Sequence, residues 1–202
     1  MTASKAPVAV AVFLSGGGRS LKNLIDYQRK GNLGNIEFQL AISSSSKVRG
    51  VEIAREAGIE TRVVLKSAFA EPDGYTEAMF GPCREHGIQL VVMAGFLKHV
   101  RIPNDYARRV INIHPSLLPS FGGEGMYGNR VHQAALNRGV QFSGCTVHYV
   151  DNDYDNGPII LQRCCAVAKD DTAESLAARV FQLECEALPE ALLESVSSLE
   201  RL

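Results

Sequence analysis

The feature that most constrains the fold is an apolar run that ends in three consecutive glycines. Val8–Leu14 is apolar and rich in β-branched residues, which is typical of a strand buried on both faces. Glycines 16–18 stop the run, and Leu21, Leu24 and Ile25 then recur at helical spacing. A buried strand that leads through glycines into a helix predicts the first unit of a parallel sheet.

Apolar runs and helical patterns continue to alternate along the chain. In the first half we expect further strands at 38–42, 61–65, 90–94 and 110–113, and helices at 20–28, 51–57 and 74–85. Gly81-Pro82 predicts a kink or a restart in the last of these helices. In the second half we expect a helix at 131–136, an antiparallel strand pair at 142–150 and 159–167, and a closing helix at 172–193.

This order predicts the fold class. It is α/β, with an open, mainly parallel, Rossmann-like sheet, helices on both faces and an antiparallel C-terminal strand pair. The 202 residues fit one domain.

Composition excludes several function classes. A formal net charge of −1 gives no electrostatic case for nucleic acid or an anionic membrane. No run of 18 apolar residues predicts a membrane span, and the N-terminal apolar stretch is too short for a signal peptide. Five cysteines without CxxC spacing predict reduced, packed thiols rather than disulfides or zinc. We therefore expect a soluble, cytoplasmic protein without a metal.

The glycine turn is a candidate phosphate site. Glycines allow close backbone approach, and a helix N-terminus offers free N–H groups and a partial positive charge. Arg19 would add a charged hydrogen bond. The loop has no Walker lysine, and Leu21 stands where a dinucleotide motif needs glycine, so a mononucleotide phosphate fits better. A plain tight turn stays open as the alternative.

The most informative segment is Ile111-Asn112-Ile113-His114-Pro115. Asn112 and His114 lie two residues apart at the end of an expected strand, so both side chains point to one face. That end of a parallel strand is where open α/β sheets place their ligands. An Asn amide can stabilise a developing oxyanion, and a His can carry a proton.

Asp155 lies in the polar turn between the two late strands. Its carboxylate could orient the His, take a proton or fix a water, as acyl transfer to an amine requires. Considered singly, His114 reads as a structural residue at a strand end, and Asp155-Asn156-Gly157-Pro158 reads as a strong turn. The residues alone favour an α/β enzyme with a phosphate-bearing substrate.

Four segments together carry a family resemblance. They are Phe13-Leu14-Ser15-Gly16-Gly17-Gly18-Arg19-Ser20-Leu21, Val91-Val92-Met93-Ala94-Gly95-Phe96-Leu97, Asn112-Ile113-His114-Pro115-Ser116-Leu117-Leu118-Pro119 and Asp155-Asn156-Gly157-Pro158-Ile159-Ile160-Leu161-Gln162. In this order they resemble the phosphoribosylglycinamide formyltransferases, a folate-dependent formyltransferase family. The resemblance runs from about Val8 to Glu190.

The resemblance implies one formyltransferase domain over residues 1–202, whose N-terminal half binds the phosphate substrate and whose C-terminal half completes the folate and catalytic sites. It implies transfer of a formyl group from 10-formyltetrahydrofolate to the amine of glycinamide ribonucleotide (GAR) in purine synthesis, without a metal. It implies small-molecule substrates only, no nucleic acid, no membrane, and a monomer or weak homodimer. The resemblance also implies roles for individual residues. The implied catalytic residues are Asn112, His114 and Asp155, with His148 as a neighbour of this group. The implied GAR-binding residues are Gly18, Arg19, Ser20 and Glu184, and the implied folate-binding residues are Leu97, Lys98, His99, Val100 and Asn112.

Two departures from the family pattern bear on the site. Lys98 replaces an Arg often found beside the folate, so a bidentate contact to a carboxylate becomes monodentate. Residues 121–130 resemble a longer loop variant, and their glycines suggest a mobile flap over the substrate. The alternatives are a 10-formyltetrahydrofolate hydrolase and a non-catalytic nucleotide-binding α/β module.

Overall fold

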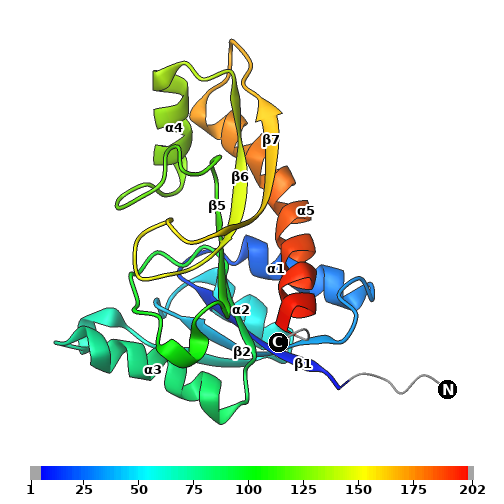
Figure 1. The fold of residues 1–202 in the computed structure, drawn as a ribbon, viewed down its shortest axis with the longest axis vertical. Coiled ribbons are helices and arrows are strands. Elements are labelled where there is room, and N and C mark those ends of the chain that lie inside the picture. Colours follow the sequence, from blue (N-terminus) through cyan, green and yellow to red (C-terminus); the bar gives the residue numbers. More distant parts are fainter. Residues whose placement is uncertain (1–5, 200–202) are drawn as a thin grey trace. The chain divides into compact units, whose positions relative to one another are not determined.

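A computed structural model describes residues 6–199 of the chain (Figure 1). The chain divides after Val110 into two compact units. Among the described residues, no helix is long and apolar enough to cross a membrane.

The first unit is built on four parallel strands, β1 (Val8–Leu14), β2 (Ile36–Ser43), β3 (Glu60–Val63) and β4 (Leu90–Met93). They lie in the order β3-β2-β1-β4, so β1 is flanked on both sides. Every residue of β1 and β4 is buried, as the uniformly apolar sequences predict. The expected parallel arrangement is confirmed.

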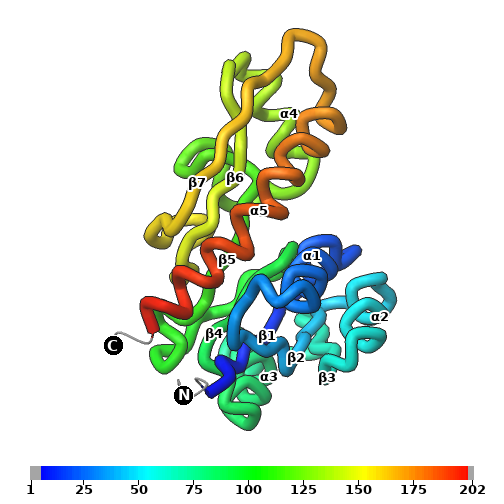
Figure 2. The backbone as a smooth tube through the Cα atoms, turned by 90° about the vertical axis from the view of Figure 1, so that its right-hand side faces the viewer, coloured from blue at the N-terminus to red at the C-terminus, as the bar shows by residue number. Residues whose placement is uncertain are grey.

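Helices α1 (Arg19–Arg29), α2 (Arg49–Glu56) and α3 (Pro72–Glu85) complete this unit (Figure 2). Successive strand residues point to opposite faces of a sheet. Phe13 of β1 packs edge-on against Phe80 of α3, with ring centroids 5.5 Å apart. The next residue, Leu14, lies against Gly50 of α2. Thus α3 and α2 cover opposite faces, and the expectation of helices on both faces is confirmed.

The expected restart at Gly81-Pro82 is wrong. Helix α3 continues from Pro72 to Glu85 with Pro82 inside it. Proline removes one backbone N–H donor, but Met79, Phe80 and Cys83 of the surrounding turns are all buried. Burial of this face holds the helix together across the lost hydrogen bond.

The second unit contains the antiparallel strands. β5 (Val110–His114), whose first residue closes the first unit, pairs antiparallel with β6 (Phe142–Tyr149), and β6 pairs antiparallel with β7 (Ile159–Ala166). The expected C-terminal strand pair is confirmed. Helices α4 (Asn129–Arg138) and α5 (Ala173–Leu199) complete the unit. Both are longer than the periodicity predicts, and α5 continues through Pro189 with its buried face intact.

Candidate active site

Strand β5 carries the first two residues of the expected catalytic group. Asn112 lies opposite His148 of β6, and His114 lies opposite Thr146. Because alternate strand residues share a face, Asn112, His114 and His148 point to the same side. The side chain of His114 is 5% exposed and that of His148 is 2% exposed.

The turn between β6 and β7 returns Asp155 to these histidines. Its Oδ2 lies 3.4 Å from Nδ1 of His114, and its Oδ1 lies 3.7 Å from Nε2 of His148. Asp155 has a positive φ of 52°, in the left-handed region that residues other than glycine adopt uncommonly. The structure therefore brings Asn112, His114, Asp155 and His148 into one cluster.

The hydrogen bonds of His148 define its protonation. Its Nδ1 lies 2.8 Å from the carbonyl oxygen of Tyr149, which can only accept, so Nδ1 carries a proton. Its Nε2 lies 3.2 Å from the amide nitrogen of Asn112, which donates. Burial lowers the pKa of His148 from its ordinary 6.5. His148 is therefore a neutral ring that accepts a hydrogen bond from Asn112 at pH 7.

A buried hydrogen-bond network supports the loop that follows His114. The hydroxyl of Thr146 donates to the carbonyl of Ser116 at 2.7 Å and accepts from the amide of Leu118 at 3.0 Å. Gln162 of β7 donates to the Thr146 hydroxyl at 2.9 Å and to the Leu118 carbonyl at 3.0 Å. Sequence reasoning missed Thr146 and Gln162 as supporting residues, because each lies far from this loop along the chain.

Sequence reasoning also missed two main-chain contacts to the cluster. The carbonyl oxygen of Phe121 lies 2.9 Å from Nε2 of His114. The amide of Gly123 donates to Oδ2 of Asp155 at 2.9 Å. Every residue type carries the same main-chain groups, so the sequence does not indicate such contacts. The glycines of this loop are the one sequence feature consistent with close approach of its backbone to other residues.

The glycine turn of the first unit ends at the start of α1. Gly18 has a φ of 72° and precedes the first residue of α1, whose first turn has no side-chain cap and no acidic residue. A Cβ on Gly18 would lie 2.5 Å from the Cα of Gly50 in α2. At this helix start Arg19 is exposed and Ser20 is half-buried.

Ser15 joins this turn to the expected folate segment. Its amide donates to the carbonyl of Gly95 at 3.1 Å, and its hydroxyl accepts from the amide of Leu97 at 2.9 Å. Leu97 and Lys98 are exposed and Val100 is buried. The glycine turn and the expected folate segment therefore lie side by side within the first unit.

His99, the remaining residue of the expected folate segment, is half-buried, and its carbonyl accepts from Nζ of Lys66 at 3.2 Å. In the second unit Glu184 lies half-buried on α5. The pKa of the Cys145 thiol of β6 is raised to about 12 by burial and, secondarily, by the charge of Glu184. Glu184 is thereby close to β6.

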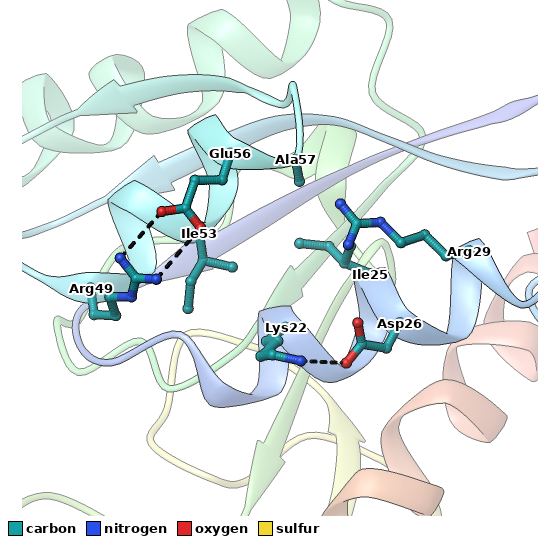
Figure 3. Close-up of a pocket in the computed structure, with 8 residues that line it drawn as sticks. All are labelled: Lys22, Ile25, Asp26, Arg29, Arg49, Ile53, Glu56 and Ala57. Atoms are coloured by element: carbon teal, nitrogen blue, oxygen red, sulfur yellow. Dashed lines mark hydrogen bonds and ion pairs between the residues drawn. The ribbon is translucent and has the colours of Figure 1, made fainter.

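A hollow of about 340 Å³ lies between α1 and α2. Figure 3 shows the ion pairs Lys22–Asp26 and Arg49–Glu56 on its walls. None of its lining residues belongs to the expected site residues; they are Lys22, Ile25, Asp26, Arg29, Arg49, Ile53, Glu56 and Ala57.

Within residues 6–199 no group of three or more His, Cys, Asp or Glu side chains is placed to hold a metal ion. Among the described residues, no cysteine forms a disulfide bond.

The conserved-domain comparison identifies the class of protein. The formyl transferase family model matches residues 8–192, so the chain belongs to the formyl transferase family. Within this family it is similar to phosphoribosylglycinamide formyltransferases. It is 39% identical over 178 residues to the chloroplastic phosphoribosylglycinamide formyltransferase of Vigna unguiculata, covering 87% of this chain and 56% of that protein.

Two solved structures show the same fold. Glycinamide ribonucleotide transformylase 1 from Symbiobacterium toebii has a TM-score of 0.85 at 34% identity, covering 92% of this chain and 86% of that one. Phosphoribosylglycinamide formyltransferase from Bacillus halodurans has a TM-score of 0.86 at 30% identity, covering 96% and 98%. The family resemblance expected from the motifs is confirmed. The chain spans only 56% and 61% of the length of two curated plant relatives that it matches.

Proposed function

We propose that this chain transfers the formyl group of 10-formyltetrahydrofolate to the amine of GAR, giving formyl-GAR and tetrahydrofolate in purine synthesis. The observation that supports this most is the cluster of Asn112, His114 and Asp155, with the His114 and Asp155 side chains 3.4 Å apart. An amide donor, an imidazole and a carboxylate are the groups that acyl transfer to an amine uses.

The proposed reaction is a direct transfer. The amine nitrogen of GAR attacks the formyl carbon, and a C–N bond forms as the carbonyl electrons move to oxygen. The Asn112 amide and the protonated His114 stabilise this oxyanion. The intermediate collapses by breaking the bond from the formyl carbon to N10 of the folate. The proton lost by the amine passes through Asp155, directly or by water, and N10 gains a proton.

The remaining residues are assigned to binding. The amides of Gly18, Arg19 and Ser20 at the start of α1 would hold the GAR phosphate, and Glu184 would contact GAR. Leu97, Lys98, His99 and Val100 would line the folate pocket with Asn112. His148 would hold the Asn112 amide in place. Backbone binding of the phosphate fits the uncapped helix start and its lack of acidic residues.

We further propose that residues 1–202 act as one formyltransferase domain with small-molecule substrates only, as a monomer or weak homodimer in the cytoplasm. The five cysteines, none of which forms a disulfide in the described part of the chain, support a reducing compartment, although the Vigna unguiculata relative is named chloroplastic.

The test is release of tetrahydrofolate from 10-formyltetrahydrofolate, with and without GAR. Release that requires GAR and collapses in His114→Ala and Asp155→Asn is the expected result. Release that does not require GAR would identify a hydrolase. If neither condition gives release while GAR still binds, the chain is a ligand-binding module and the proposal is wrong.

A further inference from the structure

Both ring nitrogens of His114 face hydrogen-bond acceptors, and only the one at Nε2 lies at ordinary hydrogen-bond distance. Nε2 lies 2.9 Å from the carbonyl oxygen of Phe121, which has no proton to give. This contact is a hydrogen bond only if Nε2 carries the proton. In the neutral ring, Nδ1 then holds the lone pair and faces Oδ2 of Asp155 at 3.4 Å. A lone pair against a carboxylate oxygen is unfavourable, whereas a proton added at Nδ1 could be donated to that oxygen.

The loop segment whose Phe121 carbonyl contacts His114 also contacts Asp155. Its Oδ2, the oxygen that faces His114, accepts the Gly123 amide at 2.9 Å. Phe121 and Gly123 are two residues apart, so one short main-chain segment contacts both members of the His114–Asp155 pair. We call residues 121–123 the main-chain bridge.

The shape of the bridge depends on its central residue. A Cβ on Gly122 would lie 2.5 Å from Cδ2 of Leu118 and 3.2 Å from Cβ of Asp155. Phe121 and Asp155 both have positive φ angles, 57° and 52°. A non-glycine residue in this region is held there by its surroundings. The bridge and Asp155 are therefore packed against each other rather than merely adjacent.

His148 has the opposite proton arrangement. Its Nδ1 donates to Tyr149 and its Nε2 accepts from Asn112. The two histidines beside Asp155 thus carry their protons on different ring atoms. The lone pair of His148 is used by Asn112, which leaves Nδ1 of His114 as the ring nitrogen that exchanges a proton with Asp155.

We propose that the 121–123 main-chain bridge is a positioning element of the reaction. It fixes neutral His114 with its proton on Nε2, while His148 carries its proton on Nδ1. The catalytic proton is the one added at Nδ1 of His114 and shared with Asp155. On the amine's attack this proton offsets the developing negative charge. As the bond from the formyl carbon to N10 breaks, the proton passes to N10, and the proton lost by the amine restores Nδ1 of His114 through Asp155. The role in catalysis rests on the proposed function, whereas the proton positions do not.

Three titratable groups face His114. Asp155 comes from the β6–β7 turn, His148 from β6, and His132 from α4. His132 is buried, its Nδ1 has no hydrogen-bond partner among the described residues, and burial lowers its pKa. Burial lowers the pKa of His132 and the pKa of His148, so each of these two rings favours its neutral form.

The first experiment reads the proton positions directly in the substrate-free, full-length protein. Long-range ¹H–¹⁵N spectra of ¹⁵N-histidine protein distinguish the two neutral tautomers, and His114→Gln and His148→Gln variants assign the signals. Spectra are recorded over a series of pH values, and the neutral form of each ring is identified from its ¹⁵N shifts. We expect the Nε2–H form for His114 and the Nδ1–H form for His148. An Nδ1–H form for neutral His114 would overturn the proposal, whatever the enzyme's activity.

The second experiment perturbs the bridge. Gly122→Ala should shift the His114 tautomer signals and lower kcat by about 10²-fold, because small displacements of reacting groups cost this much. The KM for GAR should change little. Gly74→Ala in α3, where an added Cβ meets only an ordinary contact at 3.5 Å, is the control and should leave kcat and the His114 signals unchanged. Unchanged His114 signals and kcat in a folded Gly122→Ala variant would also overturn the proposal.

Discussion

Asn112 on β5 lies directly opposite His148 on β6, and its amide nitrogen is 3.2 Å from Nε2 of that ring. The hydrogen bond fixes which way the amide points, because an Asn amide donates only through its nitrogen. The second N–H of the same nitrogen remains available for a substrate oxygen. His148 therefore acts on the substrate through Asn112 rather than by contact.

Removing the acceptor on His148 should release the Asn112 amide. For His148→Phe we expect kcat to fall about tenfold, which corresponds to roughly 1.4 kcal/mol and is within the range for one hydrogen bond. The KM values should change little, because the amide acts on developing charge. His148→Gln retains an acceptor and should recover part of the loss. Steady-state kinetics measure both, and full kcat in His148→Phe would contradict this role.

Replacing the Asn112 amide by a carboxylate should lower kcat more than His148→Phe does. Asn112→Asp keeps the shape of the side chain but places negative charge where the oxyanion develops. We expect a loss of about 10²–10³-fold in kcat, the range for removal of one oxyanion donor. The measurement is GAR-dependent release of tetrahydrofolate, with thermal unfolding as the check that the variant is folded. A loss confined to KM would show that Asn112 binds folate without stabilising the transition state.

A histidine outside the site should make stability depend on pH. His86 at the end of α3 lies 2.8 Å from Glu60 of β3 and 2.8 Å from the carbonyl of Pro82. The Glu60 hydrogen bond raises the pKa of His86 above 6.5, and the His86 hydrogen bond lowers that of Glu60 below 4.5. Because the pKa of His86 is higher in the folded protein than in the unfolded chain, the folded state binds more protons. The stabilisation from His86 is therefore complete below pH 6.5 and is lost as pH rises through the folded pKa.

The lowered pKa of Glu60 sets the acidic limit of this pH window. The stabilisation from Glu60 is present above pH 4.5 and is lost as pH falls through its folded pKa. We therefore expect His86→Gln to lower the urea midpoint more at about pH 5.5 than at about pH 8.5. The Lys22–Asp26 pair contains no histidine, so the effect of Lys22→Met should be flat over this range. An equal effect of His86→Gln at both pH values would contradict the prediction.

The contact between the glycine turn and α2 leads to a prediction about GAR binding. A Cβ on Gly50 would lie 2.8 Å from the carbonyl of Gly16 and 2.8 Å from Cδ1 of Leu14. Gly50→Ala should therefore displace the turn, lower the unfolding free energy by about 1–3 kcal/mol and raise the KM for GAR. Gly74→Ala in α3 meets only an ordinary contact at 3.5 Å and should be neutral or slightly stabilising. Thermal unfolding and GAR titration distinguish the two variants.

Much of the fold could be predicted from local patterns. Val8–Leu14 is a strand with the expected bounds, because a uniformly apolar, β-branched run is stable only when it is buried on both faces. Pro82 shows the limit of a local rule, because the restart expected as one of two outcomes does not occur. The sequence rule for proline considers one lost hydrogen bond, whereas the burial of Phe80 and its neighbours on the helix determines whether the helix continues.

The site also has a part that the sequence predicts and a part that only tertiary packing places. The alternation of a strand determines that Asn112 and His114 share a face, so the sequence by itself predicts this pair, and the motifs indicate the family. The place of Asp155 and the two contacts of the main-chain bridge were decided by the tertiary structure. Asp155 lies far along the chain from both His114 and Gly123, and main-chain donors and acceptors are the same at every position. Only the packing of Gly122 against Asp155 and Leu118 determines which of those groups reach the catalytic pair.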